Sequence, residues 1–212
     1  MRLRKIIKTL ADAYPGAATE LKYKTPFQLL VAVMLSAQCT DQRVNMITEK
    51  LFTRHHGPED FAMLSEEGLA SEIKSCGLYR SKSRHIIETS RIIMGRHGGQ
   101  VPGNRLDLER LPGVGRKTAS VVLSVIFNEP VMPVDTHVFR VSKRLGLTSG
   151  KNPVEVEHEL LNLIAPEETG YLHHCLIAHG RKICTARKPR CCVCPLISLC
   201  PRKGFDHAHC PG

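Results

Sequence analysis

The sequence has no tryptophan, and only 5% of its residues are aromatic. Its hydrophobic core must therefore be mainly aliphatic. No apolar run is long enough to span a bilayer, and no hydrophobic secretory segment follows the basic first residues. We therefore expect a protein that neither spans a membrane nor is exported. Its 212 residues suffice to bury a core as one large domain or two small ones.

Alternation of apolar and polar residues with a period of two is also missing, which argues against β-strands. Apolar residues instead recur at helical spacing along nearly the whole chain. Thr25 and Pro26 are typical of an N-cap and a first helical residue, Ser65 of a second N-cap, and Gly98 of a helix end. The proline-containing stretch 131–134 is typical of a linker. The sequence therefore predicts an all-α fold.

Acidic residues are fewer than basic ones, 20 against 30, which gives a formal net charge of +10. Such an excess favours a polyanionic partner, of which nucleic acid is the commonest. Many soluble proteins are equally basic, so charge by itself does not assign the partner.

Nine cysteines, an odd number, occur without an export signal, which indicates a reducing cytosol in which clustered thiols bind metal. Four of them follow the spacing C-x6-C-x2-C-x5-C, namely Cys184, Cys191, Cys194 and Cys200. Structural zinc sites usually combine two C-x2-C pairs, and only one is present here. The wider gaps suit a larger iron–sulfur cluster, although the spacing differs from that of ferredoxins. Both metals stay open at this point, and Cys192 competes with its neighbour as a ligand.

Three basic residues, Arg187, Lys188 and Arg190, lie between the first two cysteines of this motif. On a loop fixed by metal they would meet the phosphates of a nucleic acid. The alternative is that they only offset the charge of the thiolates.

A glycine-rich turn, Gly113-Val114-Gly115, separates two predicted helices. The first of these helices is expected to end at Pro112 and to have an apolar side made of Leu106, Leu108 and Leu111. Its backbone N–H groups and the N-terminus of the second helix are typical of an anion site, although an ordinary corner between helices has the same pattern. Lys117 falls in the first turn of that second helix. The helix dipole disfavours a cation there, which favours the free amine that a nucleophilic lysine needs. The alternatives are a solvated surface lysine and a lysine that only contacts a phosphate.

Asp135 precedes the next helical pattern and is predicted to be its N-cap. A carboxylate held in this way also stabilises positive charge that develops at a sugar carbon during glycosidic bond cleavage. The nearby His137 is either a third member of such a site or a histidine on a helix surface.

These segments together resemble the endonuclease III family of DNA glycosylase/AP lyases, which contains a helix-hairpin-helix motif. The matching stretches are LLVAVMLSAQCTD (29–41), GLYRSK (77–82), LPGVGRKTASVVL (111–123), VDTHVFRV (134–141) and the cysteine segment 179–200. The combination of a hairpin with lysine, an aspartate and this cysteine spacing is highly specific to the family.

The resemblance implies two all-helical domains that bind DNA in the cleft between them. Residues 19–130 would form a six-helix domain with the helix-hairpin-helix motif. Residues 1–18 and 131–212 would form a discontinuous domain around a [4Fe-4S] cluster. The four cysteines of the C-terminal motif would be its ligands, which decides between the two metals.

Carried over residue by residue, the resemblance implies that Lys117 is the nucleophile and Asp135 the catalytic carboxylate. Gln38 would fill the gap left by the extruded base, and Leu78 would enter the base stack as a wedge. The implied activity is that of a DNA N-glycosylase and DNA-(apurinic or apyrimidinic site) lyase, which excises oxidised pyrimidines in base excision repair and nicks the abasic site by β-elimination.

From these inferences we expect a cytoplasmic, nucleoid-associated monomer that acts on double-stranded DNA with a damaged pyrimidine or an abasic site. Two alternatives remain: a monofunctional mismatch DNA glycosylase, which would not need Lys117, and a non-catalytic iron–sulfur DNA-binding protein, which would need neither Lys117 nor Asp135. Cys39 and Cys192 occupy positions where the family is not restricted to cysteine. The tail that ends in His207-Ala208-His209-Cys210 matches no motif.

Overall fold

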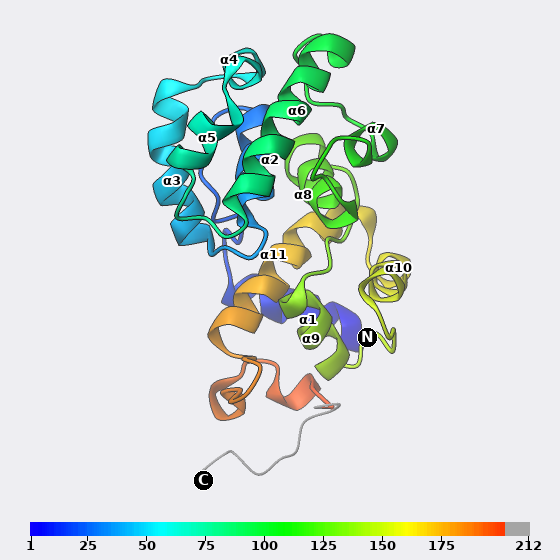
Figure 1. Cartoon of the computed structure of the whole chain (residues 1–212). Coiled ribbons are helices and arrows are strands. Elements are labelled where there is room, and N and C mark those ends of the chain that lie inside the picture. Colours follow the sequence, from blue (N-terminus) through cyan, green and yellow to red (C-terminus); the bar gives the residue numbers. More distant parts are fainter. Residues whose placement is uncertain (202–212) are drawn as a thin grey trace. The chain divides into compact units, whose positions relative to one another are not determined.

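The computed structural model of the chain describes residues 1–201, and the predicted tail motif at 207–210 lies outside them. Every regular element among residues 1–201 is a helix, which confirms the all-α prediction (Figure 1). The α-helices are α1 (Arg2–Ala13), α2 (Pro26–Ser36), α3 (Asp41–Arg54), α4 (Pro58–Met63), α5 (Glu66–Glu72), α6 (Tyr79–His97), α7 (Arg105–Glu109), α8 (Arg116–Phe127), α9 (Thr136–Arg144), α10 (Pro153–Leu163) and α11 (Pro166–Lys182). Two short 3₁₀ helices follow, η1 (Cys191–Val193) and η2 (Ile197–Leu199).

The chain forms two compact units. One consists of Glu20–Phe127, and the other combines Met1–Thr19 with the chain from Asn128 onward. The first unit contains seven helices, one more than the six that the resemblance implies, and two of them have only six and five residues. No helix in the described part of the chain is long and apolar enough to cross a membrane.

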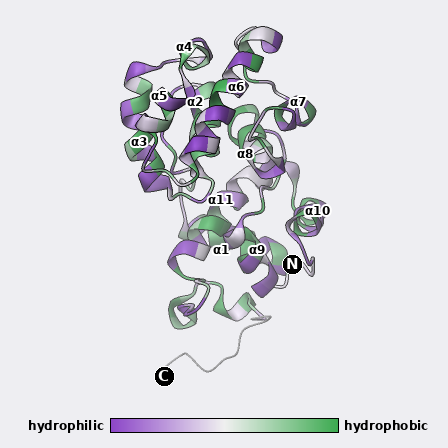
Figure 2. Cartoon of the chain, viewed as in Figure 1, coloured by the Kyte–Doolittle hydropathy of each residue, from purple (hydrophilic) through white to green (hydrophobic). Residues whose placement is uncertain are grey.

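Helix α2 is the centre of the first unit, where it packs against α3, α6 and α8. Nine consecutive residues of α2, Phe27–Leu35, are buried, because a helix that is hydrophobic on all sides is stable only when it is surrounded. The outer helices carry hydrophobic and hydrophilic residues together, as Figure 2 shows for α3. Helix α6 covers α4 and α5, and α7 packs against α8.

The predicted helix boundaries follow from local chemistry. The Oγ1 atom of Thr25 accepts the N–H group of Gln28 at 3.2 Å, and Oγ of Ser65 accepts that of Gly68 at 3.1 Å, so both predicted N-caps are confirmed. Gly98 ends α6 with a φ angle of 57°, as predicted.

The helix before the glycine turn is shorter than predicted. We expected Pro112 to stop it and Leu106 to belong to its buried side. Instead α7 ends at Glu109, and Leu106 is 64% exposed. The prediction was wrong because the chain turns more tightly after Glu109: the N–H group of Leu111 donates to the carbonyl oxygen of Leu108 at 3.1 Å, and Leu108 and Leu111 are buried whereas Leu106 is not.

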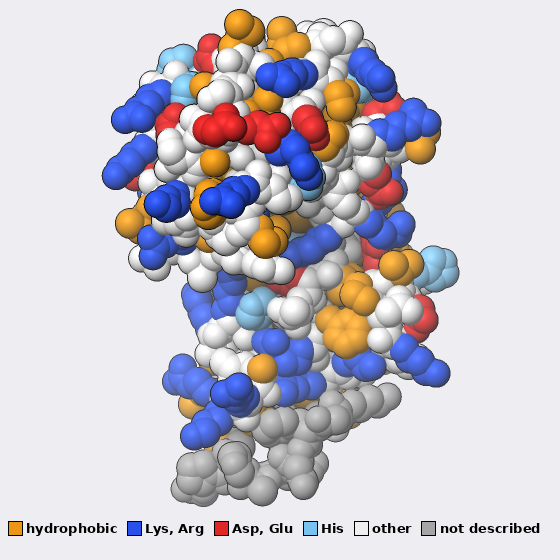
Figure 3. All heavy atoms as spheres, in the orientation of Figure 1, with side chains coloured by type: hydrophobic (Ala, Val, Ile, Leu, Met, Phe, Trp, Pro, Cys, Tyr) orange, Lys and Arg blue, Asp and Glu red, His pale blue; other side chains and the backbone are white. Residues whose placement is uncertain are grey.

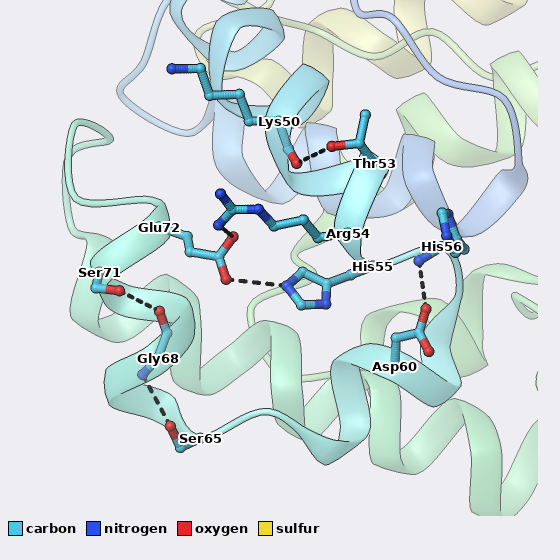
Figure 4. A network of polar contacts seen from close by, with 10 residues as sticks. All are labelled: Lys50, Thr53, Arg54, His55, His56, Asp60, Ser65, Gly68, Ser71 and Glu72. Atoms are coloured by element: carbon cyan, nitrogen blue, oxygen red, sulfur yellow. Dashed lines mark hydrogen bonds and ion pairs between the residues drawn. The ribbon is translucent and has the colours of Figure 1, made fainter.

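A polar network fixes the ends of three helices in the first unit (Figure 4). Glu72 at the end of α5 accepts Nε2 of His55 at 3.1 Å and Nη1 of Arg54 at 3.4 Å, which joins it to the end of α3. Oδ2 of Asp60 in α4 accepts the N–H group of His56 at 2.7 Å. These bonds hold the short α4 and α5 against the longer helices.

The second unit is built around α11, which packs against α1 and α9. Its core is aliphatic, as the lack of tryptophan requires, and contains Ile6 and Leu10 of α1, Val138 and Val141 of α9, and Leu176 of α11. Leu196, from the cysteine segment, is buried in the same core. This contact anchors the C-terminal segment to the helices.

Candidate active site and cysteine centre

The glycine-rich turn lies between α7 and α8, and its conformation requires glycine at position 113. Gly113 has a φ angle of 76°, and a Cβ atom there would lie 2.9 Å from Cβ and Nδ1 of His85. The hydroxyl group of Thr89 in α6 donates to the carbonyl oxygen of Pro112 at 3.0 Å. The turn is therefore held closely against α6.

Val114 is the buried residue of this turn. Its side chain is 3% exposed, and its N–H group donates to the carbonyl oxygen of Leu111 at 3.0 Å. Because this N–H group is already engaged, the predicted contact with an anion falls to the neighbouring amides. The first intrahelical bond of α8 joins the N–H group of Ala119 to the carbonyl oxygen of Gly115. The N–H groups before Ala119 therefore face out of the helix N-terminus.

Lys117 is the second residue of α8, and its side chain is exposed. The first turn of α8 contains no acidic residue, so nothing within that turn offsets the positive end of the helix. Basic side chains are widespread on the face of the molecule drawn in Figure 3. The position of Lys117, exposed at the positive end of α8, suits the approach of a phosphate chain.

Gln38 and Leu78 occupy two turns that lie side by side in the same unit. Gln38 follows α2 with a φ angle of 56°, and Leu78 precedes α6 with a φ angle of 59°. A Cβ atom on Gly77 would lie 3.4 Å from the carbonyl oxygen of Gln38. Both side chains are exposed, Leu78 to 59%. A left-handed backbone costs a non-glycine residue about 1–2 kcal/mol, and such strain is concentrated at functional sites.

Asp135 is the N-cap of α9, as predicted. Its Oδ1 atom accepts the N–H groups of His137 at 2.8 Å and Val138 at 2.7 Å. Both bonds use Oδ1, so Oδ2 takes no part in the capping. Asp135 belongs to the unit of α9 and α11, whereas Lys117 belongs to the other unit.

His137 has a packing role in the structure. The Nδ1 atom of His137 lies 3.1 Å from Nη2 of Arg140. A Cβ atom on Gly180 would lie 2.9 Å from the Cβ atom of His137. Glycine at position 180 therefore permits the close approach of α9 and α11. These contacts favour the interpretation of His137 as a helix residue held by its neighbours.

The four cysteines of the C-terminal motif line one cavity. Its walls are formed by Cys184, Cys191, Cys194, Cys200, Arg144, Leu145, His179, Ile183, Pro189 and Ile197. Cys192 is exposed and is not among the lining residues, so the structure favours Cys191 as the inward-facing thiol of the two. Burial raises the pKa of the Cys194 thiol, and the neighbouring cysteines raise it further. Among residues 1–201, no three His, Cys, Asp or Glu side chains are grouped so that they would hold a single metal ion.

Arginine and histidine side chains from the helices hold the cysteine segment. Arg144 donates to the carbonyl oxygens of Thr185 at 2.7 Å and Ala186 at 2.9 Å, and its Nη1 atom lies 3.4 Å from Sγ of Cys184. His179 lies between the Tyr14 hydroxyl group, 2.9 Å from Nδ1, and Sγ of Cys194, 3.7 Å from Nε2. Burial lowers the pKa of His179 to about 4, so its ring is neutral.

The loop within the cysteine segment exposes the three predicted basic residues, Arg187, Lys188 and Arg190. Its backbone is fixed by a bond from the Thr185 hydroxyl group to the carbonyl oxygen of Lys188 at 2.6 Å. A second bond joins the N–H group of Arg190 to the carbonyl oxygen of Ile183 at 2.9 Å. The three cations therefore project from an ordered loop.

The residues that support these sites were not predicted from the sequence. Arg144 and His179 show no motif of their own, because they act through contacts with residues distant in the chain. Lys82, which is 6% exposed, is the last residue of the matching stretch GLYRSK (77–82), but no role was predicted for it from the sequence.

Comparison with known proteins gives consistent results. Residues 31–166 match the family model of the HhH-GPD superfamily base excision DNA repair protein. The chain is 50% identical over 198 residues to "Endonuclease III" of Rickettsia prowazekii, with 93% of each chain covered. It is 47% identical over 199 residues to "Endonuclease III" of Escherichia coli, with 94% of each covered.

The chain is also similar to solved structures of related proteins. One is the structure of a trapped endonuclease III–DNA covalent intermediate, an estranged-adenine complex; it is 44% identical to the chain, with a TM-score of 0.90 and 95% of each chain covered. A thermostable thymine-DNA glycosylase, at 24% identity and a TM-score of 0.86 over 95% of this chain and 96% of its own, shares the fold.

Proposed function

Since the chain belongs to the HhH-GPD superfamily of base excision DNA repair proteins, and within it to the endonuclease III family, we propose that it is a bifunctional DNA glycosylase and AP lyase. It excises oxidised pyrimidines from duplex DNA and nicks the resulting abasic site by β-elimination. Its partner is double-stranded DNA in the cytoplasm, at the nucleoid, where it acts as a monomer.

The observation that carries this proposal is the position of Lys117. An exposed amine follows directly after a turn whose form is fixed by Gly113, at the positive end of a helix. A lyase needs such an amine to form a covalent bond with the sugar. A monofunctional glycosylase activates water instead and has no use for a lysine here.

In the first step the duplex binds through the backbone amides of Gly113 and Gly115 and through Arg187, Lys188 and Arg190. The damaged base then leaves the stack, which costs a few kcal/mol and less for a poorly stacked lesion. Leu78 enters the stack as an apolar wedge, and the Gln38 amide pairs with the orphaned base. The exposure of both side chains supports these roles.

In the chemical steps Nζ of Lys117 attacks the anomeric carbon of the deoxyribose. The new carbon–nitrogen bond forms as the glycosidic bond breaks, and the base departs. The carboxylate of Asp135 stabilises the positive charge that develops on the sugar. The attached nitrogen gives one proton to the departing base. The bond between the anomeric carbon and the ring oxygen then breaks, the ring oxygen takes up a proton from solvent, and a protonated imine joins Lys117 to the opened sugar. The imine acidifies the neighbouring sugar carbon, and loss of that proton expels the 3′ phosphate and cuts the strand.

We further propose that Cys184, Cys191, Cys194 and Cys200 hold a [4Fe-4S] cluster. A zinc ion needs all four sulfurs about 2.3 Å from one point, whereas a cubane receives each thiolate at a different iron. The cavity that all four cysteines line, together with the membership of the chain in the endonuclease III family, supports the cluster. Its bonds to four thiolates would cross-link the segment that carries the basic loop. The reaction above needs no redox step.

An assay on a duplex that contains thymine glycol tests the proposal against both alternatives. The proposed activity gives a cut strand. An intact strand with a missing base would indicate a monofunctional glycosylase, and unchanged DNA would indicate a protein that only binds.

A further inference from the structure

Lys82 is a buried lysine to which neither the chemistry nor DNA binding assigns a role. We propose that it is a positioning residue, which fixes the turns of Gln38 and Leu78 so that both are ready to enter the duplex. This inference rests on the proposed function, because it concerns the residues that replace the extruded base.

Lys82 is buried, with 6% of its surface exposed, and its ammonium group has polar partners within the protein. Its Nζ atom lies 2.8 Å from the carbonyl oxygen of Leu35, 2.6 Å from that of Ala37 and 3.1 Å from Sγ of Cys76. An ammonium group has three N–H donors, and here it has three acceptors. A buried cation without such partners would be strongly destabilising, so these contacts have to be maintained.

The side chain of Lys82 completes the end of α2. The last turn of α2 contains no basic residue, and its C-cap, Ala37, makes no capping bond through its own N–H group. A cation at a helix C-terminus binds the last carbonyl groups and is favoured by the helix dipole. Lys82, a residue of α6, therefore caps α2 immediately before Gln38.

The backbone of Lys82 contacts the turn of Leu78. Its N–H group donates to the carbonyl oxygen of Leu78 at 3.0 Å, which closes the first turn of α6. Cys76, two residues before Leu78, donates its thiol to the carbonyl oxygen of Leu35 at 3.1 Å. One residue thus joins the turn of Gln38 through its side chain and that of Leu78 through its backbone.

The conformation of these turns needs such support. Gln38 and Leu78 both have left-handed backbones, which persist only where the surrounding structure fixes them. Without the ammonium group, the carbonyl groups at the end of α2 lose their donors and the turns relax. The two side chains would then have to be ordered during extrusion, which slows that step.

The variant Lys82→Met keeps the length of the side chain and removes the ammonium group. Lys74→Met, which removes an exposed lysine between α5 and α6, is the matched control. Single-turnover excision is measured on thymine glycol paired with adenine and on the same lesion in an unpaired bubble, where extrusion costs little. We expect Lys82→Met to slow excision from the paired duplex about tenfold or more and from the bubble less than about threefold. Lys74→Met should leave the ratio of the two rates unchanged.

A coupled variant separates positioning from general damage. In a Gln38→Ala background, Lys82→Met should cause little further loss on the paired duplex, because its side chain acts through the turn of Gln38, whose amide is already removed. If Lys82→Met does not fold, Cys76→Ala, which removes one acceptor of Nζ, takes its place with a smaller shift of the same kind. Equal loss on both substrates, or no loss on either, would overturn the inference. A wild-type protein that cuts neither substrate would instead refute the proposed function.

Discussion

Oδ1 of Asp135 accepts the backbone N–H group of Val138 at 2.7 Å, so the proposed catalytic carboxylate is also the N-cap of α9. The two roles have different chemical requirements. Capping needs only an oxygen that accepts N–H groups, which asparagine supplies as well as aspartate. Stabilising a cationic sugar needs the negative charge.

Asp135→Asn should therefore separate stability from activity. We expect it to change the free energy of unfolding by less than about 0.5 kcal/mol, and Asp135→Ala to cost about 1 kcal/mol through loss of the cap. Base excision should fall on the order of 100-fold or more in both variants. Urea denaturation and single-turnover excision measure the two quantities. An Asp135→Asn variant with wild-type excision would exclude the catalytic role.

The hairpin turn offers a matched pair of glycines. Gly113→Ala should destabilise the protein by about 1–3 kcal/mol, because the φ angle of 76° is strained for alanine and the new Cβ atom would meet His85. At Gly115 a Cβ atom meets nothing within 4 Å, so Gly115→Ala should cost less than about 1 kcal/mol. Thermal unfolding of the two variants is the comparison. Equal losses would show that the turn is not fixed as described.

In the cysteine segment, Arg144 holds the backbone of the loop, whereas Lys188 is proposed to contact DNA, so substitutions of the two should have different effects. Arg144→Met removes the bonds to Thr185 and Ala186, so we expect lower iron content, a weaker visible absorption band and weaker DNA binding. Lys188→Met should keep its iron and lower the slope of DNA affinity against salt by about 1, the effect of one lost phosphate contact. An Arg144→Met protein with full iron and full affinity would contradict this role.

Many helix ends of the fold could be predicted from the sequence, because the residues that set them act locally. Thr25, Ser65 and Asp135 cap the helices that follow them, and Gly98 ends α6, because hydroxyl, carboxylate and glycine chemistry acts within one turn. The length of α7 was not predicted, because the apolar spacing of Leu108 and Leu111 is the same in a helix and in the tighter turn that the chain makes after Glu109.

The candidate site also contains residues that could be predicted from the sequence and residues that could not. The spacing of the cysteines predicted a metal site, and four thiols line one cavity. The supports of that cavity, Arg144 and His179, were not predictable, because their partners lie far away in the sequence. Lys82 was missed for the same reason: only the folded structure brings the end of α2 to its ammonium group.

Glu159 makes stability depend on pH. Its carboxylate accepts the hydroxyl group of Thr148 at 2.7 Å and the N–H group of Ser149 at 2.8 Å, and these bonds lower the pKa of Glu159 in the folded state. A lowered carboxyl pKa stabilises the fold above the unfolded value, which is about 4.3, and this contribution disappears as the pH falls through the folded value. Glu159→Gln should therefore be less stable than wild type at pH 7, and the difference should shrink on acidification.

Urea midpoints of both proteins at several pH values from about 7 down to about 2.5, a range that extends below the unfolded value, measure this difference. Glu49→Gln, at an exposed position of α3, is the control and should follow wild type throughout. A constant difference between Glu159→Gln and wild type across the range would contradict the assignment.

The most direct test of the account is to trap the bond between Lys117 and the sugar. Borohydride added during turnover on thymine-glycol duplex reduces the imine to a stable amine, so a protein–DNA adduct should accumulate, and peptide mass spectrometry should place it on Lys117. Lys117→Gln should give no adduct and no nicking while it still binds the lesion. Strand cutting by Lys117→Gln, or an adduct on another residue of the wild-type enzyme, would contradict the central claim.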